Sequence, residues 1–197
     1  MRRLVLILVL LAAPALATQD GWPALHDVTG VAADDVLNVR AAPHGSAAIV
    51  GALAPDAAGV EVIRSSDDHR WGLVNAGEGT GWVSLTFMAR RPGQWFGSTP
   101  ALASCFGTEP FWTLGFESEG DAVTWATPEE TRAGRLLSRP APSNDRRRHG
   151  LVLALDGLRV ASVRTETCGD GMSDREYGIA IDVIGERVLS GCCTLQR

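Results

Sequence analysis

Three carboxylates in the second half of the chain have the residue types that acid/base chemistry needs. Glu109 precedes Pro110, and Asp170 and Asp174 lie in a glycine-rich stretch. Two carboxylates in unlike environments can act as general acid and general base in hydrolysis. The competing interpretation, which we favour, is that Glu109 caps a turn and the aspartates hydrogen-bond the loop backbone. Asp170, Asp174 and Glu176 are also oxygen ligands that suit calcium, but their spacing departs from the D-x-[DN]-x-[DN]-G pattern.

The four cysteines are Cys105, Cys168, Cys192 and Cys193. An even count in an exported chain predicts disulfides, with three possible pairings. Because a bridge between neighbours would be strained, we expect Cys192 and Cys193 each to pair with Cys105 or Cys168. Successive side chains on a strand point to opposite faces, so the two bridges should leave that strand in opposite directions.

Two other uses of these cysteines are disfavoured. A four-cysteine zinc site would lack any C-x-x-C spacing. A nucleophilic Cys105 would have to stay unpaired among three other cysteines, and His149 is the only histidine that follows it. We therefore predict no metal, no cofactor and no catalytic residue.

A ligand-binding surface is predicted in the first half, at Asn38, Arg40, Trp71 and Trp82. Aromatic side chains at a barrel rim stack on rings, and asparagine or arginine hydrogen-bonds a peptide backbone. The alternative is that the tryptophans fill a small core while Asn38 and Arg40 secure the turn at Pro43.

The pattern around these residues resembles a known domain. The chain reads Leu37-Asn38-Val39-Arg40-Ala41-Ala42-Pro43, then Gly51, Gly59, Trp71 and Gly81-Trp82-Val83. This resembles the bacterial SH3-like (SH3b) domain, over about a third of the chain. The resemblance implies a small β-barrel outside the cytoplasm that binds cell-wall peptides or other extracytoplasmic ligands.

The second half carries different motifs. They are Cys105-Phe106-Gly107-Thr108-Glu109-Pro110-Phe111-Trp112, Cys168-Gly169-Asp170-Gly171-Met172-Ser173-Asp174-Arg175 and Gly191-Cys192-Cys193. They resemble a family of bacterial extracytoplasmic proteins and lipoproteins that brings no established activity. Within them, Glu109, Trp112, Asp170 and Asp174 form a candidate site.

The first 17 residues are predicted to be a cleavable export signal. Arg2-Arg3, the apolar run Leu4 to Ala13 and Ala15-Leu16-Ala17 supply its three regions, and the apolar run is too short to span a bilayer. We expect a periplasmic or secreted protein with no membrane attachment after cleavage.

Composition excludes several classes of function. The net charge is −5, and removing Arg2 and Arg3 makes it −7, which disfavours nucleic acid as a partner. All 18 basic residues are arginine, so Schiff-base chemistry and a P-loop lysine are excluded.

Short strand patterns separated by turn residues predict an all-β protein. We expect an SH3-like domain over residues 26–89, a linker over 90–104, and a disulfide-stapled antiparallel sheet or partial barrel over 105–197. Predicted strands of the second half are Phe111 to Phe116, Ala122 to Trp125, Leu151 to Leu155, Leu158 to Val163, Tyr177 to Ile184 and Val188 to Ser190.

Together these features predict an exported, non-enzymatic protein that binds a cell-envelope ligand, either a peptidoglycan peptide or a protein partner. One alternative is an envelope hydrolase or enzyme inhibitor acting through Glu109, Asp170 and Asp174. Another is a subunit of a larger envelope assembly, with an exposed apolar patch around Trp95-Phe96.

Overall fold

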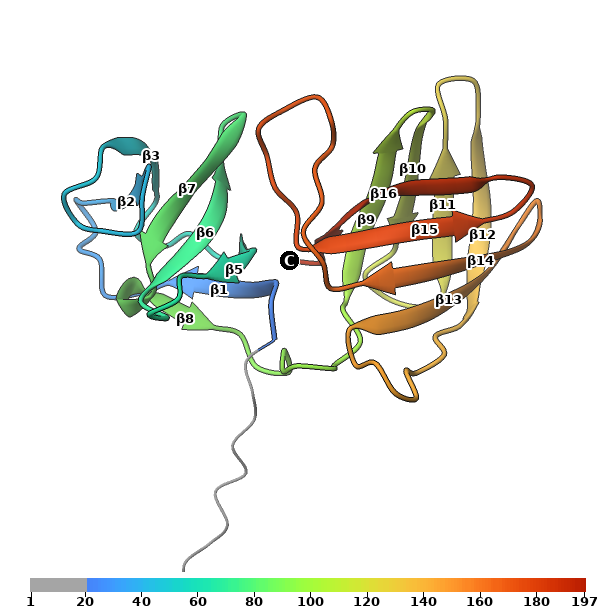
Figure 1. Cartoon of the computed structure of the whole chain (residues 1–197), viewed down its shortest axis with the longest axis horizontal. Coiled ribbons are helices and arrows are strands. Elements are labelled where there is room, and N and C mark those ends of the chain that lie inside the picture. Colours follow the sequence, from blue (N-terminus) through green and yellow to red (C-terminus); the bar gives the residue numbers. More distant parts are fainter. Residues whose placement is uncertain (1–20) are drawn as a thin grey trace, which may run out of the picture.

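The computed structural model describes residues 21–197, so the predicted export signal lies outside the described residues. The described chain is all-β apart from one short 3₁₀ turn, η1 (Leu85–Phe87). Two β bodies lie side by side, and the chain passes from one to the other through residues 91–101 (Figure 1). This confirms the predicted fold class.

The first body holds two small antiparallel sheets. One has the order β3-β2-β7-β6-β5 and the other β4-β1-β8. The strands are β1 (Ala24–Val28), β2 (Leu37–Arg40), β3 (Ile49–Leu53), β4 (Val60–Val62), β5 (Arg64–Ser65), β6 (Trp71–Ala76), β7 (Gly79–Ser84) and β8 (Met88–Arg90).

The core of the first body is built mainly from valine side chains, which alternate with polar ones along β2. Its buried members are Val28, Leu37, Val39, Val62, Val74, Val83 and Met88. Gly72 is needed for this packing, because a Cβ there would lie 2.6 Å from a methyl of Val62. The close approach of Val62 explains why a glycine occupies this position of β6.

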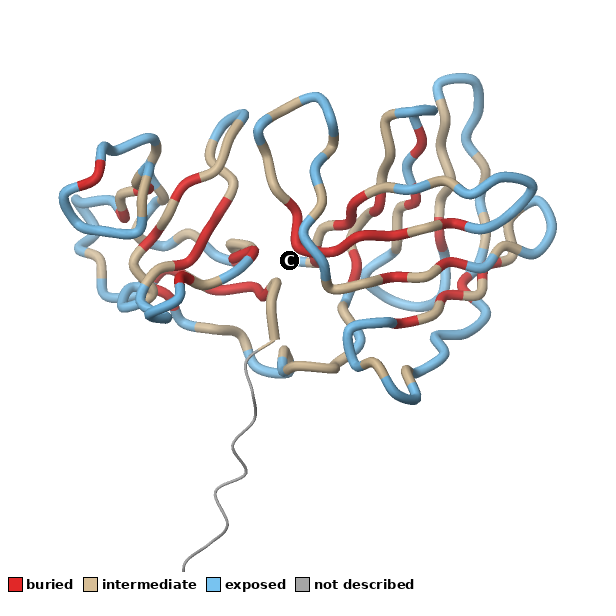
Figure 2. Tube along the Cα trace, in the orientation of Figure 1, coloured by how far each residue is buried: buried red, intermediate tan, exposed pale blue. Residues whose placement is uncertain are grey.

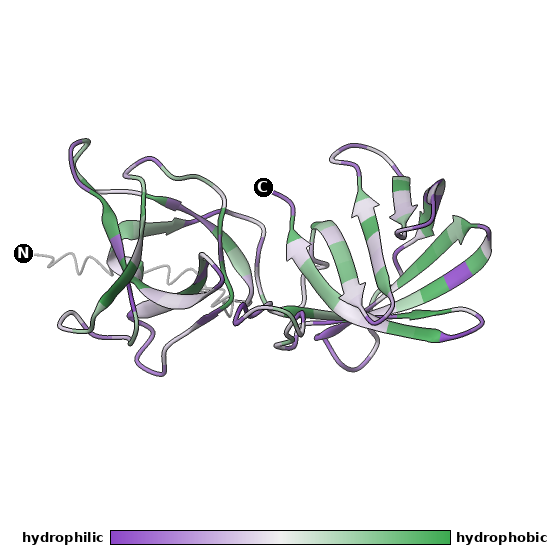
Figure 3. Cartoon of the chain, turned by 90° about the horizontal axis from the view of Figure 1, so that it is seen from above, coloured by the Kyte–Doolittle hydropathy of each residue, from purple (hydrophilic) through white to green (hydrophobic). Residues whose placement is uncertain are grey.

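The second body is a closed barrel of eight strands in which each strand pairs with the next, and the last pairs with the first. The strands are β9 (Leu102–Thr108), β10 (Phe111–Phe116), β11 (Ala122–Ala126), β12 (Thr131–Ser138), β13 (Arg148–Leu155), β14 (Gly157–Arg164), β15 (Ile179–Ile184) and β16 (Val188–Leu195). Buried residues recur along these strands (Figure 2), and hydrophobic bands alternate with polar ones (Figure 3). Closure removes the open edges that a partial barrel would expose.

The sequence did not predict two of these elements as strands. β9 begins at Leu102, inside the segment expected to be linker, and β12 was not predicted at all. In β12 the inward positions are Arg132, Gly134 and Leu136, so the strand lacks an apolar alternation. Likewise β1 begins at Ala24, before the start of the SH3-like domain expected at residue 26.

The disulfides are Cys105–Cys193 and Cys168–Cys192. Cys105 and Cys193 are direct cross-strand partners on β9 and β16. Their bridge covalently links the two strands whose pairing closes the barrel, a pairing that we call the seam. They lie in the barrel core, whereas Cys192 points the other way and holds the base of the β14–β15 loop. The structure confirms that Cys192 and Cys193 pair with Cys105 and Cys168 and not with each other, and that the two bridges leave β16 in opposite directions. Two disulfides indicate an oxidising compartment.

Candidate ligand-binding face and the carboxylate loop

The four residues predicted to bind a ligand share one face of the five-stranded sheet. Along β2, Leu37 and Val39 enter the core, so Asn38 and Arg40 point outward. Along β6 and β7, Val74 and Val83 enter the core, which leaves Trp71 and Trp82 on the same outer face. Both tryptophans are partly exposed and belong to neither core cluster.

Strand register places a row of four side chains across this outer face. Arg40 pairs with Trp82, Trp82 with Leu73, and Leu73 with Arg64. The Arg64 guanidinium carbon lies 5.0 Å from the Trp82 ring centroid, a cation–π contact. Leu73 is only 2% exposed in the middle of the row. We call this row, together with Asn38 and Trp71, the outer face.

Two hydrogen bonds fix the ends of the outer face. Arg40 donates from Nη1 to the Ala47 carbonyl at 2.8 Å, which ties its guanidinium to the turn before β3. The Trp71 backbone N–H donates to the Ser66 hydroxyl at 3.1 Å. Trp71 is the diagonal neighbour of Trp82, a separation that large aromatic side chains can bridge. The face therefore offers aromatic surface and positive charge on a rigid sheet.

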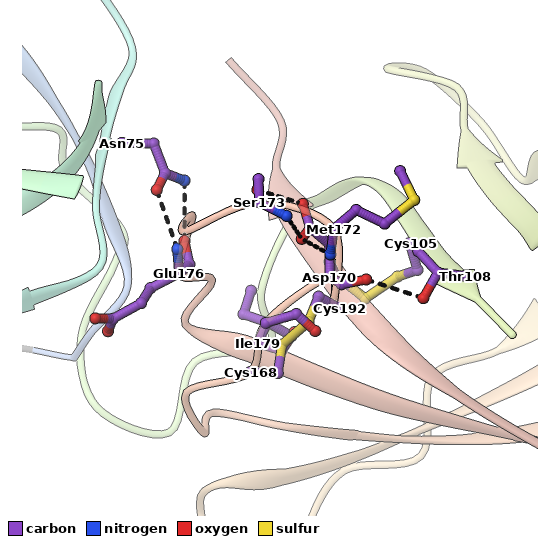
Figure 4. The surroundings of a disulfide bond; sticks show 12 residues. Asn75, Cys105, Thr108, Cys168, Asp170, Met172, Ser173, Glu176, Ile179 and Cys192 are labelled. Carbon is purple, nitrogen blue, oxygen red and sulfur yellow. Dashed lines mark hydrogen bonds between the residues drawn. A yellow bond between two sulfur atoms is a disulfide. The ribbon is translucent and has the colours of Figure 1, made fainter. Parts of the chain in front are cut away.

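A loop of the barrel reaches the first body beside this face. The loop, residues 165–178, connects β14 to β15 and rises between the two bodies in Figure 1. The Asn75 amide donates to the Glu176 carbonyl at 2.9 Å and accepts from the Glu176 N–H at 3.2 Å, as Figure 4 shows. The Glu176 carboxylate lies 3.6 Å from Arg64, the residue that stacks on Trp82.

Two further hydrogen bonds join the loop to backbone carbonyl groups of the first body. The Asp174 N–H donates to the Glu78 carbonyl at 2.9 Å, and Arg175 Nε donates to the Gly77 carbonyl at 2.7 Å. Gly77 forms the tip of the β6–β7 hairpin with a φ of 60°. The loop therefore contacts the hairpin that carries Trp82. We call the contacts of Asp174, Arg175 and Glu176 with the first body the clasp.

The predicted carboxylate cluster is divided between two places. Glu109 and Asp170 line one cavity of about 570 Å³ on the outside of the barrel. Asp174 is not among the residues that line it, because it lies against the first body with its Cβ near Gly79. The structure therefore brings two of the three carboxylates to one cavity.

Asp170 is occupied by its own loop. Its Oδ1 accepts the N–H groups of Met172 at 2.9 Å and Ser173 at 2.8 Å, and its Oδ2 accepts the Ser173 hydroxyl (Figure 4). These hydrogen bonds, led by the one from Met172, lower the pKa of Asp170. A general acid needs a raised pKa, so Asp170 acts as a turn cap rather than as a proton donor.

Trp112 lies inside the barrel instead of in the outer cavity beside Glu109. It is 3% exposed and stacks on Trp125, with ring centroids 5.0 Å apart and planes 6° from parallel. A Cβ at Gly191 would lie 2.1 Å from the Phe106 carbonyl oxygen and 2.8 Å from the Trp112 ring, which explains the glycine on β16.

Sequence reasoning missed Arg64, Leu73 and Asn75, and it named Glu176 only as a candidate calcium ligand. Their contribution depends on which strands pair and on where the β14–β15 loop lands, and neither is written in a local pattern. The only available signal was the alternation along Trp71–Asn75, which places Leu73 on the same face as Trp71.

Within residues 21–197, no group of three or more His, Cys, Asp or Glu side chains is arranged to hold a metal ion. The same residues contain no helix with the length and apolarity to cross a membrane. Comparisons with protein families, curated proteins and solved structures found no match for this chain.

Proposed function

We propose that this is an exported, non-enzymatic protein whose first body is an SH3b-like domain and whose outer face binds a peptide of the cell envelope. The Arg40–Trp82–Leu73–Arg64 row is the observation that carries the proposal. Its tryptophan surface suits the apolar parts of a peptide, and its two guanidinium groups suit carboxylates.

The peptidoglycan stem peptide is the occupant that we propose, with a protein partner of the envelope as the alternative source of a similar segment. Stem peptides combine small apolar side chains with free carboxylates, which matches both properties of the outer face. The oxidising compartment indicated by the disulfides agrees with this location.

The hydrolase or inhibitor alternative has weaker support. Asp170 and Asp174 are engaged in the loop and the clasp, and the pKa of Asp170 is lowered rather than raised. The assembly alternative has one observation in its favour, because Trp95 is 53% exposed. That side chain is separate from the outer face and serves as a control.

The test is a pull-down of residues 18–197 on purified peptidoglycan, with soluble stem peptide as competitor. We expect Trp71→Ala and Trp82→Ala each to weaken binding by about tenfold or more, as removal of a central aromatic contact does. Trp95→Ala is the matched control and should bind as the wild type does. Background-level binding by the wild type, or unchanged binding by both outer-face variants, would remove the proposal.

A further inference from the structure

The open end of the barrel farthest from the first body carries a second cavity. Four hairpin turns surround it, and they lie away from the first body in Figure 1. The cavity measures about 350 Å³. We call it the barrel mouth. Ligand sites commonly occupy such mouths, and this volume lies within the ordinary range for small molecules.

The floor of the barrel mouth is apolar. Val183 and three partly buried side chains, Trp125, Leu155 and Leu189, all occupy inward positions on their strands. Trp125 rests on the buried Trp112 ring, so the space ends there and the barrel below is filled. A ligand can therefore insert one ring system or a short chain, but not a long acyl chain.

The rim of the barrel mouth carries three arginines at positions where the strands otherwise face inward. Arg159 shares the inward side of β14 with Ala161 and Val163, and Arg132 shares that of β12 with Leu136. Arg187 continues the inward series of β16 in the turn that precedes it. Arg159 and Arg132 are half-buried, whereas Arg187 is exposed at the edge of the mouth.

Arg132 is the one arginine of the three that forms ion pairs within residues 21–197. Arg132 pairs with Glu130 at 2.7 Å and with Asp156 at 2.5 Å. Among the described residues Arg159 and Arg187 form no ion pair. Glu186 is the remaining rim carboxylate, and the rim as a whole, with three arginines and three carboxylates, has no net charge.

The Arg159 guanidinium reaches the turn that carries Arg187. The Arg159 guanidinium packs against Gly185, where even a Cβ would collide with Nη1. Gly185 belongs to the same turn as Arg187. Arg159 therefore leans over the turn that carries the second arginine.

We propose that the barrel mouth binds a small amphipathic carboxylate, with an aromatic or short aliphatic body on the Trp125 floor and the carboxylate at Arg159 and Arg187. Guanidinium groups match carboxylates in charge and in fork geometry. This site is separate from the outer face and goes beyond the function proposed above.

The test is isothermal titration of residues 18–197 with 2-naphthoate and with its neutral analogue 2-naphthalenemethanol. We expect saturable naphthoate binding with a Kd below about 1 mM, and binding of the alcohol about tenfold weaker or more. Arg159→Gln and Arg187→Gln should each weaken naphthoate binding about tenfold and leave the alcohol unchanged.

Arg135→Gln is the matched control, because Arg135 lies on the outward side of β12 in the same barrel. It should bind naphthoate like the wild type. Absence of saturable binding, equal affinity for acid and alcohol, or an Arg135→Gln defect as large as that of the mouth variants would overturn the proposal. Arg187 is exposed in a turn, so its variant should fold even if Arg159→Gln does not.

Discussion

At the scale of single residues, Glu61 is a carboxylate of the first body that is only partly satisfied. It extends from β4 toward the C-terminal end of the barrel, where its Oε2 accepts the Leu195 N–H at 2.9 Å. Its Oε1 is buried and accepts no hydrogen bond. Burial raises the pKa of Glu61, and the Leu195 N–H and the charge of Arg197 only partly oppose that change. Ionisation of Glu61 therefore lowers the free energy of unfolding.

We expect Glu61→Gln to raise the free energy of unfolding at pH 7, by about 1 kcal/mol. The folded protein holds this proton more tightly than the unfolded chain does, so the wild type loses stability as pH rises through the folded pKa of Glu61. The difference in free energy of unfolding between variant and wild type should therefore shrink as pH falls below the pKa of glutamate in the unfolded chain, about 4.3.

Urea unfolding from pH 3.5 to about 8 measures this difference. Glu129→Gln is the control, since Glu129 is exposed and should show no such trend. A Glu61→Gln variant that is less stable than the wild type at pH 7 would mean that the carboxylate stabilises the fold.

At the scale of elements, the barrel depends on the seam between its first and last strands. β9 and β16 are 88 residues apart at Cys105 and Cys193, whereas Cys168 and Cys192 close a segment of 24. In the chain-entropy model the longer closure contributes about 4–5 kcal/mol and the shorter about 3–4 kcal/mol. Cys105 and Cys193 are also fully buried, so their removal loses core packing as well.

We therefore expect the double variant Cys105→Ala/Cys193→Ala to be less stable than Cys168→Ala/Cys192→Ala. Its backbone amides on β9 and β16 should exchange hydrogen faster, because that pairing alone closes the barrel. Urea unfolding gives the stabilities, and amide exchange locates the change. Equal losses in the two variants, with seam amides still protected, would show that strand pairing closes the barrel without the bridge.

The elements also show how far the sequence could be read. Alternating residues in Phe111–Phe116 and Leu151–Leu155 predicted strands that are present, and the adjacent Cys192 and Cys193 predicted two bridges of opposite direction. β12 was missed because Arg132 occupies an inward position at the barrel mouth, where charge replaces the apolar pattern. Four residues of the outer face were named from the sequence, Asn38, Arg40, Trp71 and Trp82, but the contribution of Arg64 required the register of β5 on β6.

At the scale of the whole molecule, the two bodies contact one another at the clasp and also at residues in and next to β1. Leu25 of β1 packs with the barrel core, and a Cβ at Gly178 would lie 2.8 Å from the Pro23 ring. The interface thus has apolar contact near β1 and hydrogen bonds at the β6–β7 hairpin. Because Glu176 reaches both Asn75 and Arg64, the clasp links the barrel loop to the outer face.

Removing the Asn75 side chain should loosen the clasp without unfolding either body. Asn75→Ala deletes both hydrogen bonds to Glu176, each worth about 1 kcal/mol, while the core contacts of Leu25 remain. We expect amides of residues 169–176 to exchange several times faster, with strands of both bodies unchanged. Asn144→Ala, in an exposed barrel loop, is the matched control.

If the outer face binds an envelope peptide, the freed Glu176 should also change the affinity for that peptide through Arg64. Unchanged exchange in residues 169–176 would instead mean that the remaining clasp contacts at Gly77 and Glu78, with the Cys168–Cys192 bridge and the local Asp170 turn, hold the loop without Asn75.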